Sequence, residues 1–245
     1  MHSEIICVSR QGDRATNQDR CLAVERAGSA LLLLADGMGG HPRGELAAQV
    51  YIDSMTRQFN GAERPLAEPG EFLRRSIEQA HHDIVAAGLQ QTPPVDPRTT
   101  AVACIVQDRQ ARWAHVGDSR LYLIRDGRVL ERTRDHSLVE ELIQRGELEE
   151  SGRALHPLRN YVSRALGGDK QLPGITLSAP CTLQARDLLL LCSDGLWASV
   201  PETLLACLAG AGLLEQAASE LGVAAERAAH PGSDNVTLLA CRVTE

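Results

Sequence analysis

ALLLLADG at residues 30–37 and DLLLLCSDG at residues 187–195 are two leucine runs that end in the same way. Each run is short, apolar and bounded by a turn signal, a pattern that predicts a buried strand. Each stops at an aspartate followed by glycine, Asp36–Gly37 in the first run and Asp194–Gly195 in the second. Desolvating an unpaired carboxylate costs several kcal/mol or shifts its pKa. We therefore expect both acids to be ion-paired, hydrogen-bonded or bound to a metal.

Two further acids stand beside predicted strands. Asp234 precedes the strand-like run at 235–243, and Asp118 follows the run that ends at 116. Mg²⁺ and Mn²⁺ prefer carboxylate, carbonyl and water oxygens, and the carbonyl of Gly37 is a further candidate ligand. A single Asp-Gly pair is more typical of a plain turn, but four acids at strand ends predict a hard-metal site at one rim of a sheet.

The composition limits the classes of function. The chain has 245 residues, 43% of them hydrophobic, which predicts one large domain over residues 1–245. Its formal net charge of -7 argues against nucleic-acid binding and provides no polybasic patch for a membrane. The chain has no apolar stretch of about 20 residues, no secretory signal at residues 1–14 and no CxxC pair among its seven cysteines. These features predict a soluble, cytoplasmic protein with reduced core cysteines.

The order of predicted elements favours an α+β fold over a doubly wound sheet, in which strands and helices would alternate regularly. Strands come first, then two helices at 44–59 and 69–91. Alternating apolar residues at 99–133 predict a β-meander, followed by a short helix at 137–148. Later segments predict two more helices and a closing strand, at 202–208, 213–229 and 235–243.

Eight blocks of the sequence occur in the order found in one family. They are GDRATNQD (12–19), LLADGMGGHPRGELAA (33–48), TTAVA (99–103), AHVGDSRLYLIRDG (114–127), RDHSLVEELIQRGEL (134–148), HPLRNYVSRALGGD (156–169), LLLLCSDGLW (188–197) and GSDNVT (232–237). With these blocks the chain resembles the bacterial metal-dependent protein phosphatases of the protein phosphatase 2C type. The resemblance implies a central sandwich of two antiparallel β-sheets flanked by pairs of α-helices, with a small flap at about 147–160.

The resemblance also implies roles for individual residues at a centre of two Mg²⁺ or Mn²⁺ ions. Asp36 would bridge both ions, and the Gly37 carbonyl, Asp194 and Asp234 would complete the pair. Asp118, together with Asp194, would hold the weaker third ion of bacterial relatives.

Three residues outside the metal ligands are predicted to take part in catalysis. Arg14 would bind the substrate phosphate, because guanidinium offers two donors in a planar fork. Asp19 would orient a metal-bound water, and His41 would protonate the leaving oxygen as a general acid. The residues alone leave two alternatives open, in which Arg14 is a solvated loop arginine and His41 only shapes the cleft.

The implied activity is hydrolysis of phosphoserine and phosphothreonine in proteins by a water activated at the metal centre. The implied partners are a cognate serine/threonine kinase and its substrates, in some relatives a kinase that controls type VI secretion; nucleic acid and membranes are not expected as partners. One alternative is a catalytically weak regulator with the phosphatase fold that binds a partner protein. Another is a metal phosphoesterase that acts on nucleotides or nucleic acid.

Overall fold

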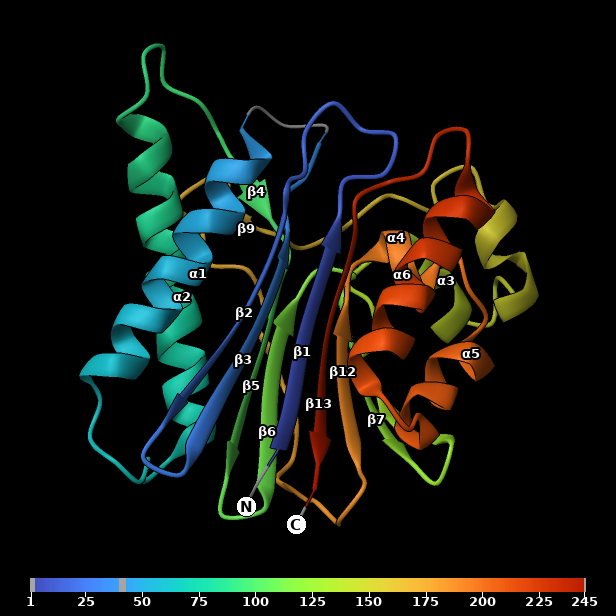
Figure 1. Cartoon of the computed structure of the whole chain (residues 1–245). Helices are drawn as coiled ribbons and strands as arrows, with labels where there is room; N and C mark the ends of the chain where they lie inside the picture. Colours follow the sequence, from blue (N-terminus) through green and yellow to red (C-terminus); the bar gives the residue numbers. More distant parts are fainter. Residues whose placement is uncertain (1–2, 40–42, 245) are drawn as a thin grey trace.

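Two antiparallel sheets lie face to face at the centre of the computed structural model, which describes residues 3–39 and 43–244 (Figure 1). The first sheet contains, in spatial order, β1 (Ser3–Arg10), β13 (Val236–Val243), β12 (Leu188–Cys192), β7 (Arg120–Arg125) and β8 (Arg128–Arg132). The second contains β10 (Thr176–Leu177), β6 (Gln110–Val116), β5 (Ala101–Gln107), β3 (Ser29–Asp36) and β2 (Asp19–Arg26), with β11 (Cys181–Thr182) also paired to β6. A separate small ribbon is formed by β4 (Arg98–Thr99) and β9 (Leu166–Gly167).

Helices cover the outer faces of both sheets. Figure 1 shows α1 (Gly44–Gly61) and α2 (Pro69–Leu89) on the side of the second sheet, and α4 (Asp194–Trp197), α5 (Glu202–Cys207) and α6 (Leu214–Ala229) on the opposite side. The shorter helical segments are α3 (Leu138–Gln144), η1 (Glu150–Leu155) and η2 (Leu208–Gly210). The predicted sandwich of two antiparallel sheets with flanking helices is confirmed.

The leucine runs are continuous because their strands are covered on both faces. In β3, Leu31 and Leu33 pack toward α1 and α2, whereas Leu32 and Leu34 pack into the space between the sheets. In the same way, β12 directs alternate leucines toward the C-terminal helices and toward the opposite sheet. Successive strand residues face opposite sides, so a strand in the middle of four layers needs apolar residues at every position.

The predicted meander at 99–133 is wrong. The hairpin of β5 and β6 belongs to the second sheet, and the hairpin of β7 and β8 belongs to the first. The chain passes from one sheet to the other at Gly117–Ser119, where Gly117 has a φ of 104° and a Cβ would lie 2.7 Å from the Thr100 methyl group. Alternation of apolar residues identifies strands but not the sheet to which each belongs.

The predicted flap at about 147–160 contains the 3-10 turn η1, in which no residue is buried. No helix in the described ranges is long and apolar enough to cross a bilayer. The single-domain organisation over 1–245 and the flap boundaries remain predictions.

Candidate metal centre

The aspartates singled out in the sequence meet at one end of the sandwich. Asp36 ends β3, and Asp19 stands directly opposite it at the start of β2. Asp118 lies in the connection between β6 and β7, Asp194 follows β12, and Asp234 precedes β13. Because neighbouring strands run antiparallel, the end of one strand meets the start of the next at the same edge. Carboxylates far apart in the sequence are therefore neighbours.

A cavity of about 620 Å³ opens at this end. Its described lining includes Arg14, Ala15, Thr16, Gln18, Asp36, Gly37, Met38, Gly39, Thr100, Asp118, Asn160, Tyr161, Val162, Asp194, Asp234 and Asn235. The structure thus brings together every residue that we predicted as a metal ligand, and Arg14 with them. Asp19 is buried and is not among these lining residues. His41 lies outside the described residues, so its predicted role stays a prediction.

The Asp36–Gly37 turn is fixed by its backbone. The Asp36 N–H donates to Thr100 Oγ1 at 3.0 Å, and the Asp36 carbonyl accepts from the Thr100 N–H at 2.9 Å. A Cβ on Gly37 would lie 2.4 Å from the Gly44 carbonyl oxygen, too close for any side chain. Glycine at position 37 therefore lets the start of α1 approach the end of β3.

A serine holds Asp19 in place. Ser193 Oγ donates to Asp19 Oδ2 at 2.7 Å and accepts from the Thr237 N–H at 3.1 Å. The other oxygen, Asp19 Oδ1, is buried and has no hydrogen-bond partner among the described residues. An unpaired buried carboxylate oxygen is costly and points to a missing ligand such as an ordered water or an ion. The sequence prediction missed Ser193, although its place directly before Asp194 is a usable signal.

Arg14 is held at the edge of the cavity by Asp234. Arg14 Nη2 donates to Asp234 Oδ2 at 2.7 Å, while 54% of the arginine side chain remains exposed. The next residue, Asn235, fastens the loop that carries Arg14: its Oδ1 accepts from the Gln18 N–H and its Nδ2 donates to the Gln11 carbonyl, both at 2.8 Å. Asn235 was also missed in the sequence prediction.

The carboxylates raise one another's pKa values. Burial, with Asp194 adding repulsion, raises the pKa of Asp19 to about 7. Burial and the Asp234 charge raise the pKa of Asp194 to about 6, and burial with neighbouring aspartates raises the pKa of Asp36 and of Asp118 well above the ordinary range. Arg14 is the only cation among the described lining residues. The site thus carries more negative charge than its own residues neutralise.

This donor set fits small divalent cations. In the described ranges, no three His, Cys, Asp or Glu side chains form a compact ligand group for one ion. Mg²⁺ keeps several waters and takes one or two carboxylates, so it needs no such group. The site therefore suits hydrated Mg²⁺ or Mn²⁺. It offers carboxylate and carbonyl oxygens, it carries excess negative charge, and it leaves one oxygen of Asp19 without a partner among the described residues.

The raised pKa of Asp19 predicts how pH affects the stability of the metal-free protein. A carboxyl group with a folded pKa near 7 binds more protons in the folded state than in the unfolded chain, whose pKa is 3.8, so its contribution to stability falls as pH rises between these values. We expect Asp19→Asn to remove this loss. In chelator, the Tm of the variant minus the Tm of wild type should increase by about 5 °C or more between pH 5 and pH 7.5.

The comparison with the variant is needed because buried histidines act in the opposite direction. Burial lowers the pKa of His81, His115 and His136, so these residues favour folding more as pH rises toward 7. Their effect is the same in wild type and Asp19→Asn and cancels in the difference. A Tm difference that stays constant or shrinks with rising pH would contradict the prediction.

Comparisons with known proteins cover nearly the whole chain. The family model for protein phosphatase 2C matches residues 8–206. The serine/threonine phosphatase stp of Listeria welshimeri is 36% identical over 175 residues, which are 71% of this chain and 69% of the relative. The solved structure of Mycobacterium tuberculosis PstP, a serine/threonine phosphatase, has a TM-score of 0.85 at 31% identity and covers 99% of each chain.

The descriptions of two other similar structures name a metal ion and a cellular process. The catalytic domain of PstP in complex with two manganese ions has a TM-score of 0.83 at 31% identity and covers 99% of each chain. PppA, described as a key regulatory component of T6SS in Pseudomonas aeruginosa, has a TM-score of 0.80 at 29% identity. That match covers 99% of this chain and 98% of PppA.

Proposed function

Because the chain belongs to the protein phosphatase 2C family, we propose that it is a metal-dependent phosphatase that hydrolyses phosphoserine and phosphothreonine in proteins. The observation that carries this proposal is the convergence of Asp36, Asp118, Asp194 and Asp234 on one cavity with Arg14 at its edge. Relatives named serine/threonine phosphatases support the activity rather than a regulator without turnover. Bound Mg²⁺ or Mn²⁺ would supply Lewis acidity and lower the pKa of a water.

We assign each aspartate a role in binding these ions. Asp36, the Gly37 carbonyl, Asp194 and Asp234 would together hold the two ions. Asp118 lines the same cavity as Asp194 and, with it, would hold a third ion. Asp19, positioned by Ser193 Oγ at 2.7 Å, would accept a hydrogen bond from a metal-bound water and so orient it.

Arg14 binds two oxygens of the substrate phosphate through its guanidinium fork. The same group pairs with Asp234 in the structure, so it lies within reach of the metal ligands. A phosphate bound to Arg14 would therefore lie beside the aspartates. His41 remains our candidate for the acid that protonates the serine or threonine oxygen as it leaves.

Arg14→Ala is expected to lower kcat/KM for a phosphothreonine peptide about 10- to 100-fold, mainly by raising KM, because a charge-assisted hydrogen bond contributes about 1.5–3 kcal/mol. Arg14→Lys should recover only part of this, since an ammonium group cannot bind bidentately. Arg75→Ala, an exposed arginine of α2, is the matched control. Steady-state kinetics with Mn²⁺ measure all three, and equal KM values for wild type and Arg14→Ala would exclude a phosphate-binding role.

We further propose that the substrates are proteins phosphorylated by a bacterial serine/threonine kinase. The enzyme would reverse the action of this kinase in the cytoplasm. All seven cysteines are free, as in proteins of reducing compartments. The similarity to PppA supports, as one candidate for this cognate kinase, a kinase that controls type VI secretion.

Hydrolysis of phosphothreonine peptides and of nucleotides, compared under the same conditions with Mn²⁺, tests the substrate class. We expect higher kcat/KM for the peptides, and hydrolysis of nucleotides alone would reject the proposal.

A further inference from the structure

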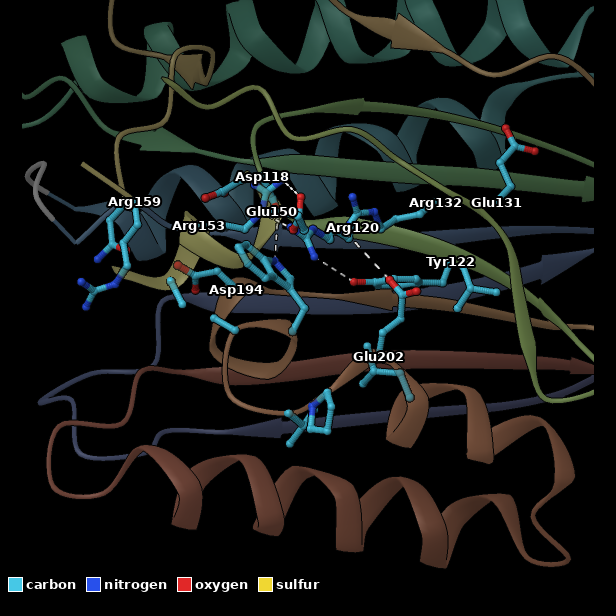
Figure 2. Close-up of a pocket in the computed structure, with 18 of the residues that line it drawn as sticks. Asp118, Arg120, Tyr122, Glu131, Arg132, Glu150, Arg153, Arg159, Asp194 and Glu202 are labelled. Atoms are coloured by element: carbon cyan, nitrogen blue, oxygen red, sulfur yellow. Dashed lines mark hydrogen bonds and ion pairs between the residues drawn. The ribbon is translucent and has the colours of Figure 1, made fainter. Parts of the chain in front are cut away.

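A second cavity, of about 900 Å³, adjoins the metal site (Figure 2). It lies between β7, β8, the flap, α4 and α5, and it shares Asp118, Asn160 and Asp194 with the first cavity. Figure 2 shows Asp118 and Asp194 at one side of this cavity and Glu202 at another. A group bound here would therefore be a close neighbour of a phosphate at the metal site.

The two arginines deepest in this cavity are already fully engaged. Arg120 donates to both oxygens of Asp135, at 2.8 and 2.7 Å, and to Tyr122 Oη at 3.1 Å. Arg153 donates to Asp135 at 3.1 Å and to Glu150 at 2.6 Å, and it also pairs with Glu140. Neither guanidinium has a free fork for a second phosphate.

The remaining charges also disfavour an anionic ligand. The described lining contains four arginines against five acids, Asp118, Glu131, Glu150, Asp194 and Glu202. Two of the acids are predicted metal ligands, and the other three stand on β8, the flap and α5. A lining without excess positive charge gives a phosphate or an acidic peptide no electrostatic advantage.

Most of the uncharged part of the lining is apolar and preformed. Val200 and Leu205 belong to the hydrophobic core behind the first sheet, and Val129 packs against this core. Trp197 is fixed on two sides: Arg120 lies 3.6 Å from its ring centroid, and its Nε1 donates to the Asp118 carbonyl at 3.0 Å. A cavity of this size with rigid apolar walls and a polar rim is typical of a binding site.

Apolar side chains are also exposed along the flap and directly after it, near the cavity and the metal site. Leu155 is 86% exposed, Leu158 48% and Tyr161 58%. Tyr161 lines the metal cavity, and on β8 Leu130, which is 52% exposed, lines the second cavity. Several large apolar side chains in water beside one site indicate a surface that another molecule covers.

We propose that the second cavity binds an apolar side chain of the phosphoprotein substrate, aliphatic or aromatic, within about four residues of the phosphorylated one. The inference rests on the proposed function and extends it to substrate choice. An extended peptide advances about 3.3 Å per residue, so a chain whose phosphate lies at the metal site reaches the adjoining cavity within a few residues. Burying the apolar side chain there stabilises the complex without a second charged contact.

A set of phosphothreonine peptides tests the proposal. Each has alanine at all flanking positions except one, which carries leucine at an offset from -4 to +4. Binding is measured with Mn²⁺ by fluorescence anisotropy on peptides that carry a non-hydrolysable phosphonate in place of the phosphate, and hydrolysis of the phosphopeptides is measured with Mn²⁺. We expect leucine at one or two neighbouring offsets to lower Kd about tenfold relative to the all-alanine peptide, and to raise kcat/KM by a similar factor. Equal Kd values at every offset would overturn the subsite.

Three variants connect the preference to the cavity. Ala198→Trp, which fills the cavity from the residue directly after α4, and Leu130→Asp, which changes its rim, are each expected to remove the leucine preference. Leu213→Asp, an exposed leucine outside the cavity, should keep it. Preference retained in both cavity variants, with folding verified by thermal unfolding, would also overturn the proposal. Unequal Kd values without any hydrolysis would support the subsite and reject the proposed enzymatic function.

Discussion

Asp36→Asn is expected to lower kcat/KM for a phosphothreonine peptide by about 10³-fold or more. Asp36 ends β3 among four other buried or half-buried aspartates, and we assign it the position between two ions. An amide carries no charge and bridges two cations poorly, so the variant loses most of the several kcal/mol that metal ions contribute to the transition state. Calorimetric titration should show weaker Mn²⁺ binding in parallel with the lost activity.

Folding and catalysis can be separated in this variant. Burial and neighbouring aspartates raise the pKa of Asp36, so the metal-free protein is expected to tolerate the neutral amide without a lower Tm in chelator. Asp53→Asn, on the exposed surface of α1, is the matched control and should keep wild-type kinetics. Full activity in Asp36→Asn would refute its place at the metal centre.

Arg120→Met is expected to destabilise the fold by about 3–5 kcal/mol, measured by chemical denaturation. The ion pair of Arg120 with Asp135 is bidentate, and the two side chains are only 5% and 1% exposed. Removing the guanidinium leaves Asp135 with Arg153 alone and takes away the cation that lies over the Trp197 ring. Trp197 fluorescence should therefore change as well.

An exposed ion pair gives the control for this effect. Arg57 pairs with Asp83 at 2.6 Å, but its side chain is 67% exposed. Such pairs contribute about 0–1 kcal/mol, so Arg57→Met should change stability little. The double variant Arg120→Met, Asp135→Leu should be less destabilised than Arg120→Met, because it leaves no buried carboxylate short of a partner. Equal losses for Arg57→Met and Arg120→Met would contradict this explanation.

The leucine runs predicted two buried strands and also the functional importance of the acids that follow them. An acid after a buried run needs compensation, and Asp36 and Asp194 lie at the same cavity, where the proposed metal ions would supply it. Local sequence carries this information because the strand and its terminal acid are contiguous. The order of the elements predicted the α+β class for the same reason, because each strand and long helix has its own apolar period, whereas the sandwich itself was implied by the family resemblance.

Contacts between distant segments could not be predicted in this way. Ser193 meets Asp19 across 174 positions in the chain, and only the folded sheets bring them together. The four-residue helix α4 is too short to show a period, and the passage between sheets at Gly117 leaves the alternation of apolar residues unchanged. The second cavity has walls from β7, β8, the flap, α4 and α5, so no single stretch of sequence marks it.

Phosphate release from a phosphothreonine peptide, measured with millimolar Mn²⁺ and again after chelation, tests the metal-dependent activity most directly. The five aspartates and Arg14 predict release with Mn²⁺, loss of release in chelator, and recovery when Mn²⁺ is restored in excess. No release with Mn²⁺, or the same rate in chelator, would contradict the assignment of this cavity as a catalytic metal centre.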